Sequence, residues 1–251
     1  MSKYKINTTG ITDGISNLNI NIAGDNNHTS NSSIAKVGYS TKQTFIDIHV
    51  EDGQIVDTGS LSKNLNYYYL FIGDQCLIKE NDNPNKIYNN IIRLPIDGNR
   101  DGIRVSTGST TQYLFQNISF SAILVCKINR WITDSTIHYF FYINNNATKI
   151  ENRSYSPHTI IGRNSKDNIK TDDLYNKLNT WVKIVITGDV ANDVSKVYID
   201  NQLCYSYSPQ YSGMKNPISF IVEGAYSEVD VEYLKVISGV WTPENQIDLE
   251  D

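Results

Sequence analysis

Three carboxylates alternate with valine in the stretch Glu228-Val229-Asp230-Val231-Glu232. In a β-strand every second side chain points to the same face, so this spacing places the three carboxylates on one side of a sheet. Two carboxyl groups about 5–5.5 Å apart can act as nucleophile and general acid in retaining glycoside hydrolysis. The alternative is an acidic outer face of a strand whose two valines point into a core.

Aromatic side chains are the second group that could carry a function, because rings stack on the faces of pyranose sugars and polar neighbours supply hydrogen bonds. Tyr205, Tyr207 and Tyr211 lie in a Tyr-dense segment that we expect to be a loop, and Trp131 follows a turn. These four are the candidate ligand-binding residues. The other two tryptophans, Trp181 and Trp241, are expected to anchor the core or the edge of a sheet.

No other constellation predicts catalysis, a cofactor or a metal. The four histidines are scattered, the three cysteines lack metal-binding spacing, and no nucleotide-binding glycine motif stands between a strand and a helix. The oxygen-rich stretch 97–101 could hold calcium, but a structural turn is the favoured interpretation. We therefore predict no catalytic residues, no cofactor and no metal site.

Composition excludes several classes of protein. The 251 residues carry 22 basic and 27 acidic side chains, a net charge of −5, which gives no basic footprint for nucleic acid. No apolar run reaches the ~20 residues that span a bilayer. The start of the chain has no signal-peptide pattern, and three unpaired cysteines suit a reducing cytosol. With 29 Asn and 33 Ile but six Ala, the residue usage indicates an AT-rich genome and favours strands.

The pattern predicts two parts. Residues 1–60 form a polar arm followed by a hairpin, since two alternating runs at 45–50 and 54–57 flank an Asp-Gly turn. Residues 61–251 contain strands at regular intervals with polar turns between them, which is typical of an antiparallel sandwich or barrel. The expected strands are 67–72, 91–95, 102–106, 118–128, 137–143, 159–162, 180–187, 195–199, 218–222 and 229–237, with a short helix from Thr242.

Three groups of segments, in this order, resemble laminin-G-like or concanavalin A-like lectin and glucanase domains. They are 101–105 with 120–128, then 179–187 with 196–203, and finally 231–237 with 241–247. The second group is similar to that family's "W-x-x-(V/I)-x-(V/I)" strand and its "Y-(V/I)-D-G" hairpin, with Asn201 in place of glycine. The resemblance implies an all-β fold, a two-sheet antiparallel jelly-roll sandwich.

The same family includes laminarinase-type glycoside hydrolases that carry E-x-D-x-E on a strand. As the resemblance implies, their motif lies mid-chain with aromatic-rich strands after it. Here 19 residues follow Glu232, and they match the family's closing strand instead. The position favours an acidic outer face over a catalytic site.

These observations together predict a non-enzymatic phage virion protein, such as a capsid decoration, a head fibre or a tail-associated receptor-binding subunit. The arm would dock onto other virion proteins, the sandwich would face outward and bind a host-surface glycan, and the chain would form a homo-oligomer. It would be made in the host cytoplasm and would neither bind nucleic acid nor insert into a membrane. The alternative is a bacterial carbohydrate-binding module or a laminarinase-like glycoside hydrolase.

Overall fold

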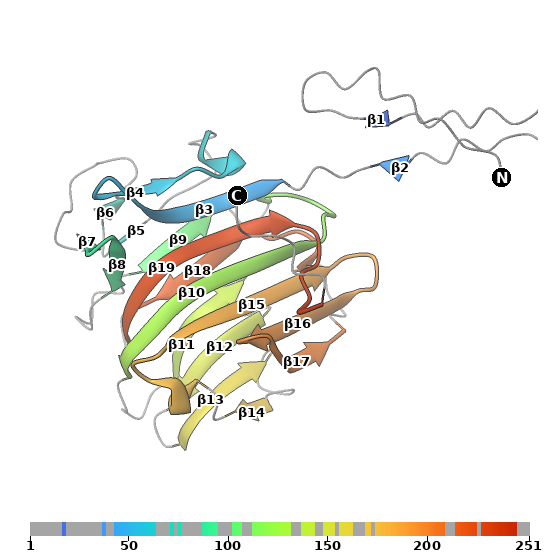
Figure 1. Ribbon diagram of the computed structural model, residues 1–251. Coiled ribbons are helices and arrows are strands. Elements are labelled where there is room, and N and C mark those ends of the chain that lie inside the picture. The colour runs from blue at the N-terminus through green and yellow to red at the C-terminus, as the bar shows by residue number, and fades with distance from the viewer. Residues whose placement is uncertain are drawn as a thin grey trace, which may run out of the picture. The chain divides into compact units, whose positions relative to one another are not determined.

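The computed structural model shows a protein whose regular elements are almost all β-strands in the part of the chain that it describes (Figure 1). It describes residues 17–18, 37–38, 43–63, 71–72, 75–76, 87–94, 102–106, 112–131, 137–143, 148–153, 156–162, 169–171, 174–208, 214–224 and 227–244. The chain divides into two compact units, 1–43 and 44–251. In the first unit, β1 (Asn17–Leu18) pairs with β2 (Val37–Gly38).

The larger of two main sheets in the second unit has nine strands. Its central order is β17-β16-β15-β10-β19-β3-β4, while β8 also pairs with β19, and β7 with β8. All the described strand pairs in this sheet are antiparallel. The strands are β3 (Thr44–Glu51), β4 (Gln54–Asp57), β7 (Ile87–Tyr88), β8 (Ile91–Leu94), β10 (Phe120–Trp131), β15 (Trp181–Asp189), β16 (Val194–Ile199), β17 (Gln202–Tyr207) and β19 (Ser227–Ser238).

The second main sheet has six strands in the order β14-β13-β12-β11-β18-β9, also antiparallel. They are β9 (Gly102–Ser106), β11 (Ile137–Ile143), β12 (Thr148–Arg153), β13 (Ser156–Gly162), β14 (Ile169–Thr171) and β18 (Ser219–Glu223). In Figure 1 this sheet lies behind the long strands β19, β10 and β15. A short pair, β5 (Phe71–Ile72) with β6 (Gln75–Cys76), and two 3-10 turns, η1 (Ser60–Lys63) and η4 (Tyr175–Lys177), complete the described elements.

One large core joins the two sheets. Alternate residues of β10, beginning with Phe120 and Ala122, meet Phe220 and Val222 of β18 in a single cluster of buried side chains. The ring of Phe120 packs edge-on against that of Phe220, with centroids 5.5 Å apart. Because each sheet buries one face against the other, the predicted fold class, an all-β two-sheet antiparallel sandwich, is confirmed.

The predicted hairpin is present as β3 and β4. Its turn residues Asp52 and Gly53 have φ values of 50° and 75°, as a two-residue turn that follows the strand twist requires. The sequence interpretation grouped this hairpin with the N-terminal arm in 1–60, whereas β3 is hydrogen-bonded to β19 in the nine-stranded sheet. The docking role predicted for the arm remains a prediction.

Most predicted strands coincide with observed ones. The described strands β2, β6, β7, β12, β14 and β17 were not predicted, and β17 falls where the sequence suggested a Tyr-rich loop. The expected C-terminal helix lies mostly outside the described residues, and Pro243 and Glu244 form a turn. Among the described residues, no helix is both long and apolar enough to cross a membrane.

Candidate functional site

The face of the nine-stranded sheet turned away from the core is called here the outer face. On β10, Leu124, Cys126 and Ile128 belong to the core, so the intervening residues Val125 and Lys127 point to the outer face. Polar side chains and a second apolar cluster share this face.

Four outer-face residues from four adjacent strands form a cross-strand row, called here the Trp181 row. Arg93 of β8 lies opposite Asp230 of β19, and Asp230 lies opposite Lys127 of β10. Lys127 in turn lies opposite Trp181 of β15. Directly opposed side chains on one face of a sheet are close enough to interact.

Asp230 is the hub of the Trp181 row. Arg93 donates from Nε to Oδ1 at 2.7 Å and from Nη2 to Oδ2 at 3.1 Å. The ammonium Nζ of Lys127 lies 3.1 Å from Oδ2. The Asp230 side chain is 1% exposed, so both cations are held against a carboxylate that water barely reaches.

Burial by itself would raise the pKa of Asp230, because it penalises the charged form. Hydrogen bonds from Arg93, Asn129 and Lys127, together with the charge of Arg93, outweigh burial and lower this pKa below its usual 3.8. Asp230 is therefore an anion at neutral pH.

Trp181 is one of three large hydrophobic side chains that the described residues expose, at 40% of its surface. The Lys127 ammonium lies 5.5 Å from the centroid of its ring, and the Lys127 side chain is 27% exposed. A cation near an aromatic face attracts the ring, which restrains both side chains. The row thus offers an aromatic surface next to an ammonium group that can donate hydrogen bonds.

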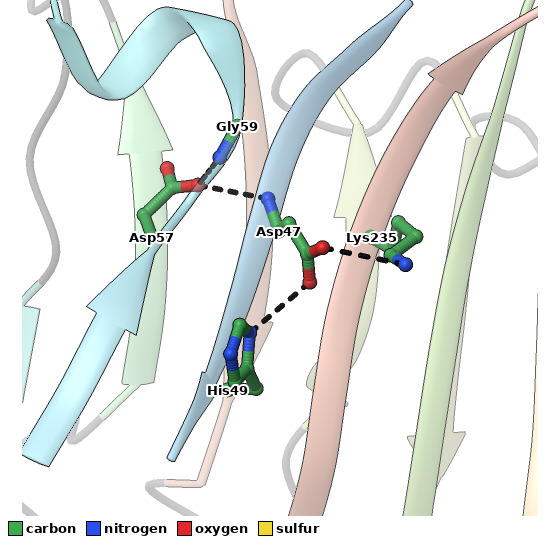
Figure 2. A network of polar contacts seen from close by, with 5 residues as sticks. All are labelled: Asp47, His49, Asp57, Gly59 and Lys235. Carbon is green, nitrogen blue, oxygen red and sulfur yellow. Dashed lines mark hydrogen bonds and ion pairs between the residues drawn. The ribbon is translucent and has the colours of Figure 1, made fainter. Parts of the chain in front are cut away.

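A second polar network lies where β4, β3 and β19 meet (Figure 2). Oδ1 of Asp57 accepts hydrogen bonds from the backbone N–H groups of Asp47, at 2.8 Å, and Gly59, at 2.7 Å. The Asp47 carboxylate lies 3.2 Å from Nδ1 of His49 and 3.3 Å from Nζ of Lys235. Asp47 and Lys235 are each less than one-fifth exposed, so this network fastens the hairpin to the sheet.

The chain after β19 folds back over part of the outer face. The Ser121 hydroxyl donates to the carbonyl of Gly239 at 2.8 Å and accepts from the backbone N–H of Trp241 at 2.7 Å. Trp241 is 1% exposed and packs with Ile123, Val185, Tyr198 and Ile237. This segment covers the face around Ile123, four residues before Lys127 on β10.

The E-x-D-x-E stretch lies in β19. Val229 and Val231 are fully buried in the core, as the acidic-face interpretation predicted. A register shift opposes Val125 to Tyr233 and Cys126 to Val231, which leaves Glu232 as the extra residue of a β-bulge. The central carboxylate is neutralised by Arg93 and Lys127, so the stretch is organised as an ion-pair network around Asp230.

The four predicted ligand-binding residues are not gathered at one site among the described residues. Trp131, 6% exposed, and Tyr205, 4% exposed, belong to the core. Tyr207 is half-buried and lies beside Tyr205, with ring centroids 5.1 Å apart. Tyr211 lies outside the described residues. The assignment of these four residues as ligand-binding residues remains a prediction.

Trp181 and Trp241, which were both expected to be anchors, differ in exposure in the structure. Trp241 is a buried anchor as predicted, whereas Trp181, also expected to be an anchor, is exposed. Alternation within β15 could have indicated this, because Val182, Ile184 and Ile186 fill the core and Trp181 has the opposite parity.

Within the described parts of the chain, no three histidine, cysteine or carboxylate side chains come together as metal ligands would. The stretch 97–101, considered for calcium, lies outside those parts. Cys126 is buried and Cys204 partly exposed, and neither forms a disulfide.

No protein-family model and no curated protein sequence matches the chain. Solved structures with a similar fold include binding domains of botulinum neurotoxins and of a mosquitocidal protein. One is the ligand-binding domain of botulinum neurotoxin serotype D in complex with N-acetylneuraminic acid, with a TM-score of 0.55, 16% identity and coverage of 80% of this chain and 49% of that one.

Two further similar structures extend the comparison. One is of botulinum neurotoxin type C, whose cell entry depends on interaction with two ganglioside molecules, with a TM-score of 0.54, 15% identity and coverage of 80% and 49%. The other is the binding domain of Paraclostridial Mosquitocidal Protein 1, with a TM-score of 0.53, 16% identity and coverage of 80% and 50%. The chain thus spans about half the length of each, and at this identity the likeness establishes the fold alone.

Proposed function

We propose that this chain is a non-enzymatic carbohydrate-binding module whose sugar site is the Trp181 row. The observation that carries the proposal is the 40% exposed indole of Trp181, held beside the Lys127 ammonium on a rigid sheet. Sugar sites combine an aromatic ring, which stacks on the apolar face of a pyranose, with donors and acceptors for its hydroxyl groups.

The site is built on strands, which favours recognition of a ligand without induced fit. Both Lys127 and Trp181 belong to long central strands whose other faces form the core. A preformed site loses little conformational entropy on binding. The toxin domains that share the fold include structures with a bound or required sugar, which supports a binding role without locating it.

The glycoside hydrolase alternative has weaker support. Asp230, the middle carboxylate of the E-x-D-x-E stretch, is nearly inaccessible and engaged by Arg93 and Lys127. Glu232 lies in a bulge, so the strict alternation that would aim the outer two carboxylates together is broken.

The proposal is tested by screening the purified chain and its Trp181→Ala variant on a glycan array. We expect the wild-type protein to bind a defined set of glycans and Trp181→Ala to lose at least about ten-fold in affinity, since a stacked ring contributes ~1–3 kcal/mol. Tyr113→Ala is the matched control, because Tyr113 is 38% exposed and lies outside the Trp181 row. The assignment of the Trp181 row as a sugar site would be refuted if the wild-type protein bound no glycan, or if both variants lost the same affinity.

We also retain the finer proposal that the module serves a phage virion, with residues 1–60 docking it to other virion proteins and with a homo-oligomeric assembly. Its support is the AT-rich residue usage, the polar composition of the N-terminal segment and the absence of a disulfide at Cys126 and Cys204. Peptide mass spectrometry of purified virions and analytical ultracentrifugation of the full chain test it. Absence of the chain from virions would refute this placement and leave the sugar site unaffected.

A further inference from the structure

We infer that Asp230 makes the Trp181 row select uncharged sugars, because its side chain occupies the position in which an acidic sugar would place its carboxylate. The inference rests on the proposed function and deepens it by naming the class of ligand.

Arg93 and Lys127 form the set of donors that a protein commonly uses for a carboxylate. The guanidinium of Arg93 presents two parallel N–H groups in a fork, and the Lys127 ammonium approaches one of the same oxygens. In this chain the carboxylate they hold is internal. Both carboxylate oxygens of Asp230 accept hydrogen bonds from Arg93, so the guanidinium is already occupied before any ligand binds.

The internal carboxylate has a large advantage over a ligand. Asp230 is fixed on β19 between β8 and β10, and backbone pairing sets its register with both cations. A ligand carboxylate would have to displace it and would lose its own freedom of motion.

A neutral sugar meets no such opposition. Trp181 offers its ring, and the Lys127 ammonium carries three N–H donors, of which the contact with Asp230 uses one. Hydroxyl groups of a stacked pyranose can accept the others without displacing Asp230. The toxin domain of similar fold that binds N-acetylneuraminic acid takes an acidic sugar, so a neutral preference here would set the two apart.

The test compares wild-type protein, Asp230→Asn and Glu228→Gln on an array that pairs neutral oligosaccharides with counterparts bearing uronic or sialic acid. Glu228 lies two residues from Asp230 on the same strand and is only half-buried, so its variant controls for the loss of one negative charge. We expect the wild-type protein and Glu228→Gln to bind neutral glycans. Asp230→Asn should gain at least about ten-fold in affinity for the acidic members, the worth of a charge-assisted contact.

Asp230→Asn leaves two cations without their carboxylate, so folding is checked first by the thermal unfolding transition. If that variant does not fold, the double variant Arg93→Gln with Asp230→Asn replaces it. This variant removes one cation with the carboxylate and leaves Lys127 to attract the acidic sugars. The same direction of change, with a smaller gain, is expected.

The outcomes separate the two proposals. Binding of acidic glycans by the wild-type protein in a Trp181-dependent manner would overturn the selectivity and leave the sugar site intact. The selectivity would also be overturned, with the sugar site left intact, if Asp230→Asn kept the wild-type glycan profile. The same holds if Glu228→Gln gained as much affinity for acidic glycans as Asp230→Asn. A wild-type protein that binds no glycan would overturn the proposed function and this inference together.

Discussion

Trp241 packs edge-on against Tyr198, with ring centroids 5.2 Å apart and ring planes at 78°. Tyr198 lies on the outer face of β16, so Trp241, which follows the last strand, shields a part of the sheet that is turned away from the core. The Lys183 ammonium lies 4.9 Å from the Trp241 ring centroid. The segment after β19 therefore contributes a second, smaller hydrophobic cluster.

Replacing Trp241 with alanine should lower the free energy of unfolding by about 3–5 kcal/mol, the usual cost of truncating a buried tryptophan. The residue is 1% exposed, and its loss uncovers Ile123, Val185 and Ile237. Equilibrium denaturation in urea, followed by far-UV circular dichroism, measures the change.

Trp181→Ala is the matched control, since it deletes the same side chain from an exposed position. We expect a change of less than about 1 kcal/mol, typical of surface substitutions, although the contact with Lys127 is lost. Similar destabilisation by both variants would contradict the assignment of Trp241 as the anchor and Trp181 as the exposed ring.

The sandwich could be predicted because its central strands are rich in β-branched and other apolar residues. The apolar residues of β10 and β15 and the Asp52-Gly53 turn of the first hairpin each indicate their structure locally. Strand β17 was missed because its two tyrosines, its serine and its cysteine resemble loop composition. Its inward residue, Tyr205, is buried by tertiary packing that local pattern does not reveal.

The Trp181 row could not be predicted because it depends on register between distant segments. Arg93 and Asp230 are 137 positions apart and meet only because β8 pairs with β19. The sequence drew attention to the stretch 228–232 as a possible catalytic motif, and the cations that neutralise its middle residue, Asp230, come from two other strands. Trp131 was favoured over Trp181 because a tryptophan near a turn suggests exposure, yet Trp131 packs near Phe140, with centroids 6.4 Å apart.

Acid should weaken the fold partly through Asp230. Its pKa is lowered in the folded protein, so its contribution is complete above the usual value of 3.8 and is lost as pH falls through the lower, folded value. The free energy of unfolding should therefore begin to fall near about pH 5 and decline further below pH 3.8. Urea denaturation at a series of pH values measures this.

Asp230→Asn isolates that contribution from those of the other carboxylates. The difference in stability between wild-type protein and Asp230→Asn should be largest at neutral pH and shrink as the pH falls below 3.8, where Asp230 itself takes up a proton. A difference that stays constant down to the most acidic pH would show that Asp230 does not stabilise the fold as an anion.

The two described free thiols should differ in reactivity. Burial raises the pKa of Cys126, and the negative charge of Asp200 raises it further, so the reactive thiolate is scarce in the folded protein. Cys204 is partly exposed on β17. Iodoacetamide at mildly alkaline pH, followed by peptide mass spectrometry, should label Cys204 and spare Cys126, while denatured protein should be labelled at both. Equal labelling of the two in folded protein would contradict the buried position of Cys126.

Gly59 should tolerate no side chain, because it lies directly against the backbone of β3. A Cβ atom there would stand 2.6 Å from both the Cα and the backbone nitrogen of Ile46, too close for either atom. The Gly59 N–H also donates to Asp57, the residue that fastens the hairpin in Figure 2. Gly59→Ala should therefore cost about 1–3 kcal/mol of unfolding free energy, as overpacking does.

Gly53→Asn is the control for Gly59→Ala, because Gly53 has nothing within 4 Å of its Cβ position and a φ of +75°. Asparagine adopts this left-handed conformation more readily than other residues with a side chain, so the cost should stay below about 1 kcal/mol. Thermal and urea unfolding of both variants measure the contrast. Because close backbone contact holds the hairpin against the sheet, Gly59→Ala should lower the unfolding free energy more than Gly53→Asn does. The reverse order would show that the turn, and not this contact, limits the stability of the hairpin.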